Sequence, residues 1–216
     1  MIAMILAAGR GERLRPLTDT MPKALVEVHG ESLLERHLRA LKKAGMDTVV
    51  VNLGWRGAQI VERVGSGTKY GLNVVYSPEG DDILETGGGI HRALPMLGAD
   101  PFLVVNADIY TDMPFTAATL AEDDVAHLVL VPTPEDKATG DFDLAGDRVS
   151  NGESAEFTFS GVSVYRPEFF ADCTAGRFSV VPMLRAAADA GQLCGSVYAG
   201  RWRDVGTPAR LSELNA

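Results

Sequence analysis

The sequence predicts an α/β fold: a mainly parallel, Rossmann-like mixed sheet with helices on both faces and a small β-containing extension. The first observation behind this prediction is a βαβαβ rhythm, in which short β-branched runs alternate with stretches of helical periodicity. The second is that these runs are too apolar to face water on either side, as is typical of parallel strands covered by helices. The third is length, because 216 residues with a 46% hydrophobic fraction suit one domain with a sizeable core.

The elements of the first half follow this rhythm in chain order. Strands are expected at Ile2–Leu6, Thr48–Val51, Leu72–Tyr76, Phe102–Val105 and Leu128–Val131. Helices are expected around residues 33–41 and at Ala58–Val64 and Ile90–Leu97. The first of these helices has Ser32 as its N-cap and Gly45 as its stop signal. Because ligands bind beyond the carboxyl ends of strands in such sheets, the loops after residues 6 and 105 are candidate sites.

Beyond about residue 133 the pattern changes without a linker, so we expect one domain with an extension. The expected elements are strands at Asp141–Asp147 and Phe157–Tyr165, a polar stretch at Ser150–Ala155, a helix at Ser179–Ala190, a strand at Gly195–Tyr198 and a closing helix at Thr207–Leu214.

Charge, hydropathy and cysteine content exclude several function classes. The net charge is −9, from 29 acidic and 20 basic residues, which argues against a broad nucleic-acid surface but leaves room for a local anion pocket. No apolar run approaches the ~18 residues of a membrane span, and Arg10 and Arg13 follow the first apolar run instead of preceding it, unlike a signal peptide. We therefore expect a cytoplasmic protein, with Cys173 and Cys194 as reduced thiols.

The loop after the first strand is rich in glycine and arginine. Gly9 and Gly11 suggest a dinucleotide fingerprint, but Leu14 stands where the third glycine would be, and the Gly-Lys-Ser/Thr of a P-loop is missing. Backbone N–H groups of such a loop can face an anion while Arg13 reaches phosphate oxygens. An ordinary turn is the alternative interpretation.

A lysine follows this loop on a conformationally restricted segment. Lys23 comes directly after Pro22, whose ring restricts the backbone, and directly before an apolar run. A lysine held in this way could neutralise a phosphate undergoing substitution. An ordinary surface lysine is the alternative.

Two aspartates are candidate magnesium ligands. Asp108 follows the Phe102–Val105 strand and would lie at the mouth of the sheet, where Mg²⁺ can bind through one or two carboxylates plus substrate phosphates. Asp204, just before a glycine turn and a Thr-Pro helix start, could supply the second carboxylate. Taken alone, each aspartate could equally be a turn or N-cap residue.

A third glycine cluster, within Leu84–Ile90, opens the helix that ends near Leu97. Three consecutive glycines, Gly87–Gly89, would let a flat group such as a nucleotide base approach the backbone closely. A hinge is the alternative interpretation.

Together these segments resemble the sugar nucleotidyltransferase (nucleoside diphosphate-sugar pyrophosphorylase) family. The signature L-A-A-G-x-G-x-R-x-x-P-x-T followed by P-K is carried by Leu6–Thr18 and Pro22-Lys23. Within the family the chain is similar to the compact bacterial N-acetylmuramate-1-phosphate uridylyltransferases. Segments supporting this are Gly11-Glu12-Arg13, Tyr76–Gly80, Leu84–Gly89, Gly140-Asp141-Phe142, Thr158–Gly161 and Asp204–Thr207. Glu12, where Ser or Thr is commoner in the wider family, and Ala107, where Gly is usual, depart from its pattern.

The resemblance implies a magnesium-dependent transfer of a nucleotidyl group from UTP to a sugar 1-phosphate. The expected substrate is N-acetylmuramate 1-phosphate, giving UDP-N-acetylmuramate and pyrophosphate in peptidoglycan recycling. Implied catalytic residues are Arg13, Lys23 and Asp108. Implied nucleotide-binding residues are Ala8, Gly9, Gly11, Glu12, Arg13, Lys23, Gly87, Gly88 and Asn106. Implied sugar-phosphate ligands are Gly140, Asp141 and Glu156, and implied metal ligands are Asp108 and Asp204. Residues 1–132 would form the nucleotide-binding core, 133–200 the sugar-phosphate part, and 201–216 the metal loop and closing helix.

Several other interpretations remain open at this point. One is a glucose-1-phosphate or mannose-1-phosphate nucleotidyltransferase that uses UTP, dTTP or GTP. Another is a glycosyltransferase of related fold, and a third is a non-catalytic regulatory homologue. Neither a nucleic-acid nor a membrane partner is expected, and the protein is expected to be a monomer or a small homo-oligomer.

Overall fold

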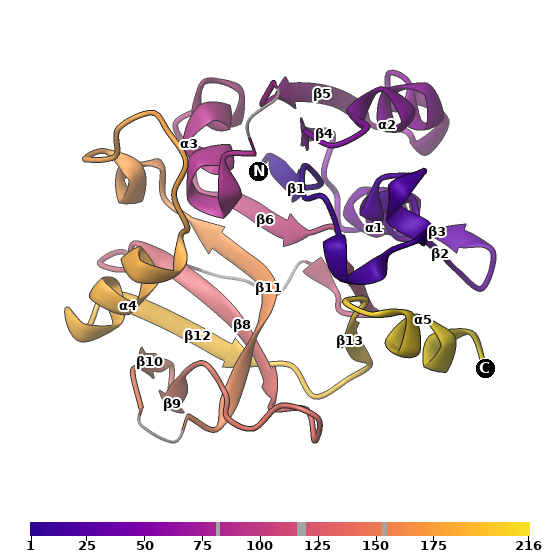
Figure 1. Ribbon diagram of the computed structural model, residues 1–216. Helices are drawn as coiled ribbons and strands as arrows, with labels where there is room; N and C mark the ends of the chain where they lie inside the picture. Colours follow the sequence, from indigo (N-terminus) through magenta and orange to yellow (C-terminus); the bar gives the residue numbers. More distant parts are fainter. Residues whose placement is uncertain (81–82, 116–119, 153–154) are drawn as a thin grey trace.

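A large mixed sheet forms the centre of the protein (Figure 1). The computed structural model describes residues 1–80, 83–115, 120–152 and 155–216. Within these ranges nine strands pair in the order β5-β4-β1-β6-β11-β8-β12-β10-β9. Two of the residues in the predicted polar stretch, Glu153 and Ser154, lie outside the described part of the chain.

The four strands at one side of the sheet are parallel. They are β1 (Ala3–Leu6), β4 (Thr48–Leu53), β5 (Asn73–Pro78) and β6 (Phe102–Asn106). All four were predicted, to within two residues at each end. β1 lies between β4 and β6, so the chain reverses its direction of winding there. In open α/β sheets such a switch point opens a crevice at the carboxyl ends of the strands.

The second half of the chain extends the same sheet. β11 (Phe157–Tyr165) pairs antiparallel with β6 and with β8 (Ala126–Pro132), and β12 (Leu193–Val197) lies parallel to β8. The expected strand at residues 141–147 is instead a hairpin of β9 (Asp143–Ala145) and β10 (Arg148–Ser150). Gly146, with φ of 63°, makes the turn between them. The region expected as an extension is therefore a continuation of the central sheet.

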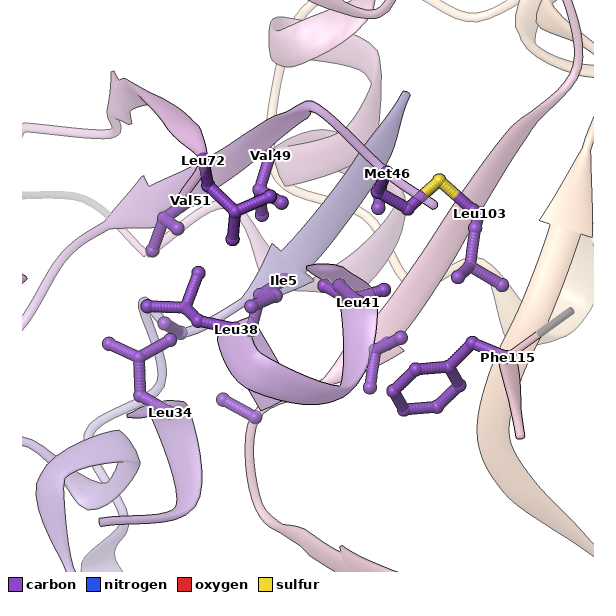
Figure 2. Close-up of a cluster of buried hydrophobic side chains, with 14 of the residues drawn as sticks. Ile5, Leu34, Leu38, Leu41, Met46, Val49, Val51, Leu72, Leu103 and Phe115 are labelled. Carbon is purple, nitrogen blue, oxygen red and sulfur yellow. The ribbon is translucent and has the colours of Figure 1, made fainter. Parts of the chain in front are cut away.

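Helices cover both faces of the sheet, as the apolar strands predict. α1 (Leu33–Lys43) and α2 (Gly57–Val64) lie on the face toward which Ile5 points. α3 (Glu85–Leu97) and α4 (Val181–Asp189) cover the face toward which the neighbouring Met4 points. Figure 2 shows Leu34, Leu38 and Leu41 of α1 against the side chains of β1 and β4.

Two of the helix ends confirm local sequence signals. The side-chain oxygen of Ser32 accepts from the backbone N–H of Glu35 and caps α1, as predicted. Thr207 caps α5 (Pro208–Asn215) in the same way. The expected helical span Ile90–Leu97 was too short, because α3 begins at Glu85, and the three consecutive glycines lie in its first turns, where the glycine cluster was expected to open the helix.

Several short elements were not predicted from the sequence. They are β2 (Glu27–Val28), β3 (Glu31–Ser32), β7 (Ile109–Thr111), β13 (Trp202–Asp204) and the 3-10 turns η1 (Glu12–Leu14), η2 (Leu17–Asp19), η3 (Lys23–Leu25), η4 (Thr68–Tyr70) and η6 (Pro167–Phe170). β7 and β13 pair antiparallel with each other. Two to four residues are too few to show a periodicity, so these elements depend on tertiary contacts.

Neither membrane spans nor disulfides are found in the part of the chain that the structure describes. No helix there is both long and apolar enough to cross a bilayer. Cys173 and Cys194 are both free thiols, and burial raises the pKa of Cys194 to about 11.

A buried carboxylate, Glu35, links α1 to the region after α2. Its Oε2 accepts from Ser32 Oγ at 2.8 Å and from Arg63 Nη2 at 2.8 Å, and its Oε1 accepts from Tyr70 OH at 2.7 Å. Burial opposes ionisation, but the hydrogen bonds from Arg63, Tyr70 and Ser32 outweigh it and lower the pKa of Glu35 from 4.5 to about 2. The ionised carboxylate is therefore part of the folded structure.

Replacing Glu35 with glutamine is expected to lower the free energy of unfolding at pH 7 by about 3 kcal/mol, the linkage value of this pKa difference. Because the folded pKa lies below the unfolded one, the contribution is complete above about pH 4.5 and is lost as the pH falls toward 2. Urea denaturation at pH 7, 5 and 3.5 measures it. The matched control, Glu62→Gln at an exposed position of α2, should change stability by less than about 0.5 kcal/mol. An unchanged acid dependence in Glu35→Gln would contradict this assignment.

Candidate active site

Two cavities meet at the carboxyl ends of β1 and β6. The first has a volume of about 420 Å³ and is lined by Leu6, Ala7, Ala8, Gly9, Gly11, Glu12, Arg13, Lys23, Ala24, Asn52, Glu79, Ile83, Glu85, Thr86, Asn106, Ala107, Asp108 and Gly206. The second is lined by Arg13, Asn106, Asp108, Ile109, Pro134, Asp136, Lys137, Asp141, Thr158, Phe159, Ser160, Gly161, Trp202, Asp204 and Arg210. Arg13, Asn106 and Asp108 line both, so the cavities share a wall of cationic and carboxylate groups.

The glycine-rich loop after β1 is held by contacts from two directions. Thr18 Oγ1 donates to the carbonyl of Gly11 at 2.8 Å. Trp55, in the loop after β4, donates its indole N–H to the carbonyl of Thr18 at 2.9 Å. The Trp55 ring also carries the guanidinium of Arg10, 4.4 Å from its centroid. Arg10 is therefore engaged outside the cavities, whereas Arg13 lines both of them.

Gly11 fits against the segment that carries Lys23. Its φ is 66°, and a Cβ built on it would lie 3.0 Å from Lys23 Cβ and 3.0 Å from Thr18 Cγ2. Only glycine adopts this conformation without strain and leaves room for the lysine side chain. The glycine-rich loop and the Pro22-Lys23 segment therefore pack directly against each other, which explains their fixed spacing in the sequence.

Gly11→Ala is expected to lower the free energy of unfolding by about 1–2 kcal/mol, because alanine is strained at positive φ and its Cβ crowds Lys23. Denaturant unfolding measures the loss. Gly9→Ala is the matched control in the same loop, since a Cβ at Gly9 meets nothing within 4 Å. Equal stability of the two variants would contradict the packing argument.

Lys23 and Asp108, predicted separately, form an ion pair. Lys23 Nζ donates to Asp108 Oδ2, and the two side chains are 14% and 32% exposed. No described residue accepts a hydrogen bond from the Arg13 guanidinium. Its N–H donors are therefore available to a ligand in the two cavities that Arg13 lines. Arg13 thus belongs to the shared wall, and Lys23 lines the first cavity and is bonded to Asp108 of that wall.

The two predicted metal ligands come together through the β7–β13 pair. Asp204 lies opposite Ile109 in the register, and the N–H of Val205 donates to the carbonyl of Asp108 at 2.7 Å. The bonds that the described side chains make to these carboxylates involve Oδ2 of each: Lys23 donates to Asp108 and Arg210 donates to Asp204. Both aspartates line the second cavity, and each has a carboxylate oxygen that no described side chain uses, which fits a Mg²⁺ ion that completes its shell with phosphate and water oxygens.

An ionic network missed by the sequence reasoning supports Asp204. Arg210 also donates to Asp136 Oδ2, from Nε at 3.1 Å and Nη2 at 2.9 Å. Arg203 binds the same carboxylate in a bidentate manner, with both distances 3.0 Å. Hydrogen bonds from Arg203 and Arg210 lower the pKa of Asp136. No spacing signal links residue 136 to 203 and 210, because the contact is purely tertiary.

A buried polar wall of the first cavity was also missed. The N–H of Ala7 donates to Asn52 Oδ1 at 2.6 Å, and Asn52 Nδ2 donates to Glu79 Oε1 at 2.6 Å. Glu79 Oε2 accepts from the N–H of Leu84 at 2.8 Å. Asn52 at the end of β4 and Glu79 just past β5 fit the rule that sites lie beyond strand ends, and that rule was the available signal.

Gly87 and Gly88 of the glycine cluster pack against the segment that precedes α4. A Cβ on Gly87 would lie 2.4 Å from the Phe178 ring, and one on Gly88 would lie 2.2 Å from the carbonyl oxygen of Gly176. Neither glycine lines the first cavity, whereas Thr86 does. These glycines allow close packing of α3 on the segment before α4, so the expectation that they open toward a base is not supported by their surroundings.

The expected sugar ligands differ in their placement. Asp141 lines the second cavity, and its Oδ2 accepts from Lys137 Nζ at 2.7 Å and from the N–H of Phe159 at 2.9 Å. Gly140 is packed against the backbone, since its Cβ would lie 2.5 Å from the carbonyl of Phe157. Glu156 is exposed and lines neither cavity. Of the three, the structure brings only Asp141 to the site.

Comparisons with known proteins show which sequences and which fold this chain is similar to. A model of the MobA-like NTP transferase domain matches residues 3–199. The N-acetylmuramate alpha-1-phosphate uridylyltransferase of Neisseria meningitidis is 48% identical over 227 residues, covering 100% of this chain and 97% of the relative. That of Caulobacter vibrioides is 38% identical and covers 98% and 97%. The fold matches a Bacillus anthracis protein solved in complex with sucrose, with a TM-score of 0.86, 19% identity, and coverage of 100% and 94%.

Proposed function

The chain belongs to the MobA-like NTP transferase family and is a sugar nucleotidyltransferase, and from this premise we propose that it transfers the uridylyl group of UTP to N-acetylmuramate 1-phosphate. The products are UDP-N-acetylmuramate and pyrophosphate. Two full-length relatives bearing the name of this activity support the choice of substrates. We place the reaction in the cytoplasm, where UTP is made, and in peptidoglycan recycling, because the product is an activated cell-wall sugar.

The observation that carries this proposal is the wall shared by the two cavities. One cavity lies over the glycine-rich loop and accepts the nucleoside triphosphate, and the other accepts the sugar 1-phosphate. Arg13, Asn106 and Asp108 line both, so the α-phosphorus of one substrate and the phosphate of the other meet there. Catalysis by positioning requires this kind of juxtaposition.

The chemistry is an in-line substitution at phosphorus. A phosphate oxygen of the sugar 1-phosphate attacks the α-phosphorus of UTP, a new P–O bond forms, and the bond to the departing pyrophosphate breaks. The attacking oxygen is already ionised at neutral pH, so the protein needs no general base. Lys23 stabilises the charge that develops around the α-phosphorus, and Arg13 binds the departing pyrophosphate.

Asp108 and Asp204 would hold Mg²⁺. Their adjacency through the β7–β13 pair fits the donor set that this ion prefers. Bound there, Mg²⁺ supplies charge neutralisation for the phosphates of both substrates. Arg210 and Lys23, each bonded to one of the two carboxylates, orient those side chains before the ion arrives.

A matrix of nucleoside triphosphates against sugar 1-phosphates, read by pyrophosphate release with Mg²⁺, tests the proposal. The highest kcat/KM is expected for UTP with N-acetylmuramate 1-phosphate. A preference for glucose 1-phosphate or mannose 1-phosphate, with UTP, dTTP or GTP, would replace this substrate pair within the same reaction class. Sugar transfer from a nucleotide sugar would indicate a glycosyltransferase, and no turnover with any pair would indicate a regulatory homologue.

A further inference from the structure

A lysine in the second cavity has no part in the chemistry described above. Lys137 lies in the loop between β8 and β9, and its side chain is 34% exposed. Its Nζ donates to Asp141 Oδ2 at 2.7 Å and to Thr158 Oγ1 at 3.1 Å. A lysine ammonium has three donors. Two are used within the described structure, and the third is left for a ligand.

We propose that Lys137 binds the carboxylate of the lactyl ether on N-acetylmuramate 1-phosphate and so selects sugar 1-phosphates that carry a second anionic group. This inference rests on the proposed function, because it assigns a subsite within the same active site. N-acetylmuramate differs from N-acetylglucosamine only by this lactyl group. A charged subsite is therefore the most direct way for a protein to distinguish the two sugars.

The other cations of this cavity are committed elsewhere. Among the residues that the structure describes, Arg13, Lys137 and Arg210 are the cationic side chains lining it. Arg13 stands on the wall shared with the nucleotide cavity and faces phosphate groups. Arg210 uses Nε, Nη1 and Nη2 on Asp136 and Asp204. Lys137 is the cation that belongs to the sugar side and keeps an unused donor.

The surroundings hold the ammonium group in place. Asp141 is itself fixed by the N–H of Phe159 at 2.9 Å, and Thr158 is buried in β11 and 3.2 Å from Thr133 Oγ1. Lys137 is thus anchored on a strand of the central sheet although its backbone is in a loop. Such preorganisation reduces the entropy cost of using a flexible side chain for recognition.

The test compares wild type, Lys137→Met and Lys137→Arg on three acceptors with UTP. The acceptors are N-acetylmuramate 1-phosphate, its lactyl methyl ester, and N-acetylglucosamine 1-phosphate. We expect Lys137→Met to lower kcat/KM for the first by about 10- to 100-fold, the range for one charge-assisted hydrogen bond. Activity on the ester and on N-acetylglucosamine 1-phosphate should change less than about threefold, and Lys137→Arg should restore part of the preference. Lys43→Met, on the exposed end of α1, is the matched control and should behave as wild type.

Each other outcome has a distinct meaning. An equal loss on all three acceptors would overturn the inference and give Lys137 a role in phosphate binding or in holding Asp141. An unchanged preference in Lys137→Met would overturn it as well, with the proposed function intact. Wild type that prefers N-acetylglucosamine 1-phosphate would overturn both the inference and the proposed substrate. Thermal unfolding of every variant separates these results from a loss of fold.

Discussion

Lys23→Ala is expected to lower kcat by roughly 100- to 1000-fold, the usual effect of removing one preorganised charge from a transition state, or about 2.7–4 kcal/mol. Lys23 is mostly buried, is bonded to Asp108, and packs against Gly11 of the glycine-rich loop. Its position is therefore set by the fold before substrates bind. Pyrophosphate release under saturating substrates measures the effect, because it reports kcat without the contribution of weaker binding.

The fold should survive this substitution. The ion pair is partly exposed, and water can solvate the Asp108 carboxylate once the lysine is gone, so we expect a stability change of about 1 kcal/mol or less. Lys43→Ala, at the exposed end of α1, is the control and should keep full activity. Lys23→Arg keeps the charge but replaces a compact ammonium with a planar fork, so only partial recovery is expected. Near-normal turnover in Lys23→Ala would remove Lys23 from the mechanism.

Asp108→Asn and Asp204→Asn should each lower kcat/KM at limiting Mg²⁺ by at least roughly 100-fold, or about 2.7 kcal/mol. Asparagine keeps the shape of the side chain but removes the charge that attracts the ion. Binding of Mn²⁺ in the presence of UTP, followed by electron paramagnetic resonance, gives a readout that does not depend on turnover. Both variants should weaken this binding, because the β7–β13 pair brings the two residues together and both of them line the second cavity.

Asp112→Asn is the matched control for these two variants. Asp112 follows β7 directly but accepts hydrogen bonds from Tyr198 and from the N–H of Arg201, and it lines neither cavity. Its loss should leave the metal dependence unchanged. If only one of Asp108→Asn and Asp204→Asn alters the metal dependence, the two-aspartate site is wrong.

Most of the fold could be predicted because its elements are long enough to show a period. The buried strands β1, β4 and β6 are continuous apolar runs, and α1 presents leucines at helical spacing after a Ser32 N-cap. The start of α3 could not be predicted in this way. Three glycines have poor helix propensity, and their place in the helix depends on contacts with residues 176–178, far along the chain.

The site residues also fall into two groups, those that the sequence indicated and those whose placement depends on tertiary contacts. Gly9, Gly11, Arg13 and Lys23 lie within one short segment, so their spacing carried the family resemblance that implies phosphate binding, and the packing of Gly11 on Lys23 explains that spacing. Glu156 and Gly140 were expected near the sugar from the resemblance alone. The direction in which the hairpin β9–β10 and strand β11 turn these residues depends on strand register. A shift of one residue moves a side chain to the other face of a sheet.

By itself, the sequence determined the kind of sheet, and it indicated the glycine-rich loop and the lysine behind it as a candidate phosphate site, because these depend on residues close together in the chain. The tertiary structure decided which distant groups meet that loop. It placed Asp204 beside Asp108, joined Arg210 and Arg203 to Asp136, and anchored Lys137 on Thr158. Each of these contacts crosses between elements that no local periodicity relates, and only the packing of the whole sheet determines which of them become neighbours.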